Sequence, residues 1–294
     1  MMTIGIPRGL FYYYYSDLWK FFFDKLGISY VISPETTSEI RALGGRYSND
    51  EMCLSLKNYI GHVAFLSDKC DLILVPRIDN YGKYEQTCTN FLACFDIVNN
   101  LFNNKVIDYD ISYTNGLKEK QAFIRLGMKL GKSYSDSCRA YCYALNRSKK
   151  ILKSNILDNV NKLSCLGKKI LIVSHPYNTY DACIGKRVIS YLEKLGCNVI
   201  YSDLFDKEEC MKKSLNLSSG LYWKYSREII GSIDLCKDKV DGILFLSTFP
   251  CGLDSLVNEL IIRKIDVKCL NLIIDDMDAF AGIETRLESF VDIV

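Results

Sequence analysis

The chain has 294 residues, of which 49% are hydrophobic and 24% are charged, and its formal net charge is +2. This composition is that of an ordinary globular protein, and the length suits two domains of roughly 100–200 residues each. No run of Lys and Arg is long enough to indicate a nucleic-acid partner. The apolar stretches are strand-length, well below the ~20 residues of a membrane-spanning helix, and no signal-peptide pattern opens the chain. We therefore expect a cytoplasmic protein that binds neither nucleic acid nor a membrane.

The two halves of the chain begin with the same pattern. One apolar run ends at Pro7, a second ends just before Pro176, and a Lys-Leu-Gly triplet follows each at the same spacing, closing on Gly27 and on Gly196. Each triplet ends an amphipathic segment, so each glycine is expected to cap a helix, and a new apolar run follows it. This is a strand-helix-strand unit that occurs twice.

Two further apolar runs follow in each half. They cover residues 71–75 and 105–111 in the first half, and residues 241–248 and 268–274 in the second. Short continuous apolar runs that alternate with helical patterns are typical of buried parallel sheets. We predict an α/β protein of two tandem, doubly wound parallel-sheet domains of Rossmann-like type, 1–116 and 167–294, joined by a helical bridge, 117–166.

Four prolines lie just past the predicted carboxyl ends of strands, namely Pro7, Pro76, Pro176 and Pro250. Proline cannot continue the hydrogen-bonding ladder, so we expect each strand to end there. In open α/β sheets, ligands bind beyond these carboxyl ends. The loops that begin at the four prolines are therefore the expected site.

Thirteen cysteines stand out in the composition. In a reducing cytosol they are not a disulfide framework, and so many thiols suggest a cell that rarely meets oxygen. We expect about ten of them to be small buried apolar residues, including Cys138 and Cys142 on the predicted bridge.

Three cysteines have settings that suit a metal ligand. Cys53 follows a capping-box pattern at 48–51, which predicts that it lies just after the first turn of a helix, where the dipole favours thiolate. Cys88 lies in a polar, turn-rich stretch, and Cys251 stands between Pro250 and Gly252 before a helical pattern. Gly252 permits close approach of the backbone to a ligand. A packing role is the alternative for each thiol.

These thiols are too far apart in the sequence for a compact ferredoxin-type or zinc-knuckle site. They suit an iron–sulfur cluster that the fold assembles in the cleft between the domains. Other polar residues follow the strand ends: His175 and Asn178 could hydrogen-bond a substrate or cluster sulfurs, and Arg8 and Arg77 could pair with anionic charge. The alternatives are a loop-capping histidine and surface ion pairs.

The ordered set of these motifs resembles the 2-hydroxyacyl-CoA dehydratase-like proteins, and most closely the acyl-CoA dehydratase activase-related branch (DUF2229). The motifs that carry the resemblance extend over nearly the whole chain. They occupy residues 4–10 with the tyrosines 12–15, then 50–54, 61–63, 75–77, 87–88, 175–178, 222–223, 250–255 and 281–290. One departure concerns residues 275–282, where an acidic–His–small–Gly-Glu-Ala-Gly pattern is expected and its His and Glu are missing.

The resemblance implies two Rossmann-like domains and one [4Fe–4S] cluster held by Cys53, Cys88 and Cys251. In the dehydratases, an ATP-hydrolysing activase supplies a low-potential electron, and the substrate is reduced to a ketyl radical so that water can leave. Related proteins join two cubanes through a bridging sulfide. The chain has no Gly-rich phosphate loop of its own, so an ATP-driven step needs an activase partner. An acyl-CoA or another small substrate, and a homodimer or a related subunit, are expected by the same analogy.

Two other readings remain open at this point. Two α/β halves around a cleft also describe a clamshell module that binds a ligand without redox chemistry. The same thiolates could instead hold a structural zinc ion, for which His175 would be the fourth ligand.

Overall fold

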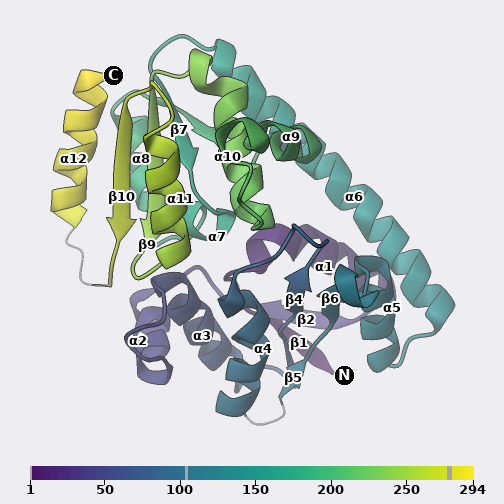
Figure 1. Ribbon diagram of the computed structural model, residues 1–294. Helices are drawn as coiled ribbons and strands as arrows, with labels where there is room; N and C mark the ends of the chain where they lie inside the picture. The colour runs from purple at the N-terminus through teal and green to yellow at the C-terminus, as the bar shows by residue number, and fades with distance from the viewer. Residues whose placement is uncertain (1, 103–104, 277–279) are drawn as a thin grey trace. The chain divides into compact units, whose positions relative to one another are not determined.

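The computed structural model describes residues 2–102, 105–276 and 280–294 (Figure 1). The chain divides into two compact units, Met1–Leu152, here called unit 1, and Lys153–Val294, here called unit 2. Among the described residues, no helix combines the length and the apolar character that crossing a membrane requires.

Unit 1 is built on a four-stranded parallel sheet with the strand order β2-β1-β3-β5. Its strands are β1 (Thr3–Ile6), β2 (Ser29–Ile32), β3 (Leu72–Leu74) and β5 (Val106–Ile107). Side chains of the two central strands, such as Ile4 and Ile73, are fully buried. That burial explains why these strands are continuous apolar runs in the sequence.

A second, two-stranded parallel sheet pairs β4 (Arg77–Asn80) with β6 (Asp110–Ser112). Strand β3 ends at Leu74, just before Pro76, which confirms the expectation that this strand ends at the proline, and a new strand in a separate sheet begins after it. The N–H of Val75 donates to Ile107 O at 2.9 Å, and the N–H of Arg77 donates to Tyr109 O at 3.0 Å. Proline removes one donor from the ladder, and the pairing resumes after it. The run 105–111 is likewise divided into two strands rather than forming one.

The helices of unit 1 surround a core rich in aromatic side chains. They are α1 (Tyr12–Leu26), α2 (Ser38–Tyr47), α3 (Leu54–Leu66), α4 (Thr89–Leu101), α5 (Glu119–Lys129) and α6 (Tyr134–Asn161), the last of which continues into unit 2. Trp19 is buried and its Nε1–H donates to the Tyr109 hydroxyl at 3.0 Å. Phe22 and Phe23 are also fully buried on α1, so this aromatic stretch forms helix core. Gly27 ends the helix with φ 62°, as predicted.

Unit 2 repeats the topology of unit 1. Its strands are β7 (Lys169–Val173), β8 (Asn198–Tyr201), β9 (Gly242–Thr248) and β10 (Cys269–Ile274), in the order β8-β7-β9-β10 and all parallel. Its helices are α7 (Pro176–Thr179), α8 (Gly185–Lys194), α9 (Lys207–Leu217), α10 (Lys224–Cys236), α11 (Gly252–Ile262) and α12 (Phe280–Ile293). Figure 1 shows the strands flanked by these helices.

In both units the first strand lies second in the sheet, between the second and third strands of the chain. The prediction of two tandem Rossmann-like parallel-sheet domains is thus confirmed. Within unit 2, Asn159 fastens the end of α6 to the sheet, because its amide donates to Tyr201 O and Leu204 O and accepts from the N–H of Tyr201. The bounds 1–116, 117–166 and 167–294 stay a prediction.

Candidate functional site

Each of the three cysteines proposed as cluster ligands immediately precedes a helix. Cys53 is the N-cap of α3, Cys88 is the N-cap of α4, and Cys251 is the N-cap of α11, all with extended backbone conformations. All three are partly exposed. The N-terminus of a helix favours thiolate, which is the form of cysteine that ligates iron. The donor set and its electrostatic setting therefore fit an anionic, thiolate-bound cluster.

Unit 1 brings together the helix starts that carry two of these thiols. The side-chain amide of Asn90 donates to the Sγ of Cys53 at 3.9 Å. Asn90 lies in the first turn of α4, two residues beyond Cys88. The N-termini of α3 and α4 are thus neighbours, whereas Cys251 belongs to unit 2.

The predicted helix start at Ser48 is wrong. Ser48 is instead the C-cap of α2, and a turn follows it, in which Asn49 Oδ1 accepts from the N–H of Met52 at 3.1 Å. Short polar side chains compete in this way with helical hydrogen bonding. Because α3 begins only at Leu54, Cys53 lies at its N-cap rather than past its first turn.

Cys251 is linked through Asp254 to His175. The N–H of Asp254 donates to Cys251 Sγ at 3.4 Å, and Asp254 Oδ1 lies 3.0 Å from His175 Nε2. Both side chains are buried, with 10% and 7% of their surfaces exposed. The His175 ring also stacks on Tyr177, with 5.0 Å between the centroids. The sequence interpretation missed Asp254 as the partner of His175, although its place three residues past Cys251 in the first turn of α11 is a signal for such a role.

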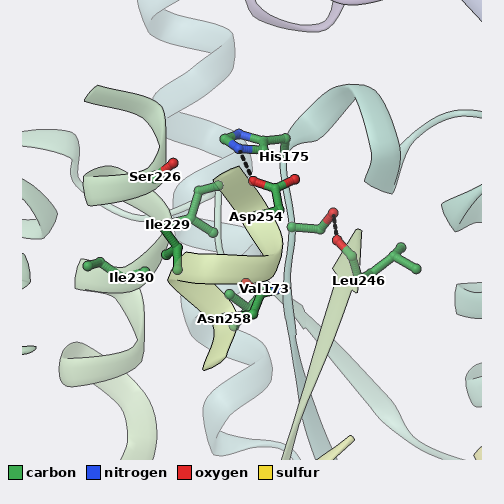
Figure 2. Close-up of a pocket in the computed structure, with 10 residues that line it drawn as sticks. Val173, His175, Ser226, Ile229, Ile230, Leu246, Asp254 and Asn258 are labelled. Carbon is green, nitrogen blue, oxygen red and sulfur yellow. Dashed lines mark hydrogen bonds and ion pairs between the residues drawn. The ribbon is translucent and has the colours of Figure 1, made fainter. Parts of the chain in front are cut away.

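The buried pair borders a small pocket in unit 2 (Figure 2). Figure 2 shows Ser226, Ile229 and Ile230 together on α10, with the pair of His175 and Asp254 beside them. The pocket lies past the end of β7, which agrees with the expected place of a ligand site in this fold. Its remaining lining residues are Val173, Ser174, Leu246, Val257 and Asn258.

Two other residues of unit 2 that were predicted to belong to the site are close in sequence to residues that line this pocket. Asn178 is fully buried in α7, where its N–H donates to His175 O at 2.9 Å, and it does not line the pocket. Gly252 is the first residue of α11, and a Cβ added there would meet no described atom within 4 Å. No close contact within the described residues therefore requires glycine at this position.

In unit 1, Arg8 follows β1, and its backbone is connected to His62 of α3 by hydrogen bonds through Ser33. The N–H of Arg8 donates to Ser33 Oγ at 2.8 Å, and Ser33 Oγ lies 2.9 Å from His62 Nδ1. His62 Nε2 lies 3.0 Å from the hydroxyl of Thr36. Burial, with a smaller effect of the Arg8 charge, lowers the pKa of His62 to about 3, so the ring is neutral at physiological pH.

Arg77 makes a surface ion pair. Its guanidinium donates two hydrogen bonds to Asp96, at 2.9 and 2.8 Å, and lies 3.6 Å from Asp110. It also lies over the ring of Phe95. Arg77 thus makes the kind of surface ion pair that the sequence left open as an alternative. Its proposed role in binding an anion stays a prediction.

The expectation that about ten cysteines are buried is wrong, because only four of the ten remaining cysteines are buried, four are partly exposed, and Cys142 and Cys165 are exposed. Cys94, Cys210 and Cys236 are buried, and burial raises the pKa of each thiol to about 12. They act as small apolar side chains, as expected. The packing role predicted for Cys142 is wrong, because this residue is exposed on α6.

Within the described residues, no three His, Cys, Asp or Glu side chains are gathered in a group that could hold a metal ion. The three candidate thiols are divided between the two units, so a cluster on them stays a prediction. The departure from the family pattern at 275–282 includes residues 277–279, which lie outside the described residues.

The sequence model of one protein family matches more than half of the chain. This family is described as the CoA enzyme activase uncharacterised domain (DUF2229), and the match covers residues 3–205. No curated protein matches the chain in sequence.

Two solved structures align with 99% of this chain at low similarity. The crystal structure of ZnuA is 12% identical over 97% of its own chain, with a TM-score of 0.28. The structure of the SBP FpvC from Pseudomonas aeruginosa in complex with Mn2+ is 14% identical over 96% of its own chain, also with a TM-score of 0.28. At this TM-score the likeness carries no argument about fold or ligand.

Proposed function

Because the chain belongs to the family of the CoA enzyme activase uncharacterised domain (DUF2229), we propose that it is a [4Fe–4S] redox protein. It receives low-potential electrons from an ATP-hydrolysing activase and passes them to a small substrate or a client enzyme. The observation that supports this function is the position of Cys53, Cys88 and Cys251, each at the N-cap of a helix. A narrower version is an enzyme of the 2-hydroxyacyl-CoA dehydratase type, which acts on an acyl-CoA.

In this proposal Cys53, Cys88 and Cys251 would hold the cluster through their thiolates. The bound cluster would supply one-electron reduction. The protein would tune the reduction potential of the cluster through hydrogen bonds to the ligating sulfurs. The N–H of Asp254 donates to Cys251 Sγ, and the side-chain amide of Asn90 donates to Cys53 Sγ.

His175 is the protein group best placed to orient a small molecule beside Cys251. Its Nε2 lies 3.0 Å from Asp254 Oδ1, and this contact fixes the position of the ring. The stacked Tyr177 holds the ring in this orientation.

The decisive measurement is iron and acid-labile sulfide per chain, in protein purified without oxygen. We expect about four irons per chain and the visible absorbance of a cubane cluster. Cys53→Ala, Cys88→Ala and Cys251→Ala should each lose most of the iron while remaining folded. Cys142→Ala is the matched control, because this thiol is exposed on α6 and should be dispensable.

Two results would contradict the proposal, and each points to a different function. Colourless, iron-free wild-type protein that stays folded would favour a ligand-binding module without redox chemistry. One zinc ion per chain in place of iron, lost in the same cysteine variants, would establish a structural zinc site. The narrower dehydratase version requires in addition that reconstituted protein binds an acyl-CoA in a calorimetric titration.

A further inference from the structure

Helix α3 buries an amide side chain in an apolar setting. Asn58 is 3% exposed, and neither its Oδ1 nor its Nδ2 has a hydrogen-bond partner among the described residues. Most of the helix around it is apolar and buried. A buried amide without partners is unfavourable, so a sequence that retains one has a use for it.

The general lean of helical side chains would point this amide toward the N-terminal end of α3. Asn58 lies one turn before His62, and residues four apart share a face of a helix. That face is covered by the loops that carry Ser33 and Thr36, whose hydroxyls contact the two ring nitrogens of His62. Side chains of a helix lean toward its N-terminus, which here is the end that carries Cys53.

The loop after β1 carries Arg8 one residue before Gly9, which packs against α3. A Cβ added to Gly9 would lie 3.1 Å from the ring and 3.2 Å from the Cα of Tyr59, so this loop rests directly on the helix next to Asn58. The Nε of Arg8 is buried and has no hydrogen-bond partner within the described residues. The only ion pair of Arg8 in that part of the chain is with the half-exposed Glu35, at 3.6 Å.

We infer that Arg8 and Asn58, beside the first turn of α3, bind the carboxylate group of a small molecule. The guanidinium supplies charge and the Nε–H donor, the Asn58 amide supplies a second donor, and the helix N-terminus favours an anion. Glu35 offsets part of the Arg8 charge, so the site suits a monoanion better than a phosphate dianion. As the substrate class of the redox protein the inference rests on the proposed function, whereas the anion site itself needs no cluster.

Sodium acetate is the probe, and thermal unfolding of the full chain at constant ionic strength is the readout. A group of so few atoms should bind in the millimolar range and raise Tm in a saturable manner, while the neutral analogue acetamide should not. Arg8→Gln should weaken acetate binding about tenfold or more. Arg46→Gln, at an arginine of α2 that lies over Tyr47, should bind acetate as the wild type does.

Asn58→Leu separates a binding role from a structural one. Replacing an unsatisfied buried amide with an apolar side chain of similar size should raise Tm without ligand, by about 2–6 °C, and abolish the acetate effect. A lower Tm would show that Asn58 is structural and would overturn the inference. So would an unchanged acetate response in Arg8→Gln, or tighter binding of inorganic phosphate than of acetate.

The proposed cluster and the proposed anion site can be tested separately. Acetate binding by iron-free protein would support this inference while contradicting the redox function. Four irons per chain without any acetate response would do the reverse.

Discussion

Gly44→Ala should destabilise unit 1 by about 3 kcal/mol or more, whereas the adjacent Gly45→Ala should stabilise it by about 0.5–1 kcal/mol. Both glycines lie within α2 and both have helical backbones. The same chemical change thus has opposite expected signs at neighbouring positions.

The difference comes from the packing of α2 against α3. A Cβ at Gly44 would lie 2.3 Å from the carbonyl oxygen of Lys57, which is backbone and cannot rotate away. Gly61 has the reciprocal contact, because its Cβ would lie 2.0 Å from the carbonyl oxygen of Ile40. At Gly45 an added Cβ meets no described atom within 4 Å, so only the better helix propensity of alanine remains.

Chemical denaturation of both variants measures the effect as a change in the midpoint at constant m-value. Because the candidate ligand Cys53 is the N-cap of α3, Gly44→Ala should also lower iron content, and Gly45→Ala should not. A Gly44→Ala protein as stable as wild type would show that the two helices are not held this closely.

The stability of the chain should fall by about 2 kcal/mol between pH 7 and pH 5 because of His62 alone. The folded protein lowers the pKa of this ring from 6.5 to about 3, first through burial and second through the charge of Arg8. In the window between these two values the unfolded chain binds a proton that the folded chain does not. Acid therefore favours the unfolded state, and the contribution is fully present only above pH 6.5.

His62→Gln tests this assignment by removing the titrating group. Glutamine can still offer one donor and one acceptor to Ser33 and Thr36, and it should lower stability at pH 7. The stability gap between wild type and variant should then narrow by about 2 kcal/mol from pH 7 to pH 5. A gap that does not change with pH would mean that His62 does not titrate in this window.

The sequence predicted the fold well because the relevant signals are local or periodic. Strand-length apolar runs, the helix-ending glycines and the repeat of the pattern around Pro7 and Pro176 need no knowledge of distant contacts. The same strand order in both units confirms that interpretation. An error arose where two local signals compete, at Ser48, where the capping pattern predicted a helix start but Asn49 forms a turn.

The sequence by itself thus determined the α/β class, the two repeated halves and the sheet edge at which polar residues gather, because those follow from periodicity and from where strands end. Only the tertiary structure decided which side chains meet there. The contact of Asp254 with His175, separated by 79 positions, and the placement of Arg8 beside α3 depend on how strands and helices pack. The partnerless amide of Asn58 likewise appears only once its surroundings are folded, since burial and hydrogen bonding are properties of the three-dimensional neighbourhood and not of the chain.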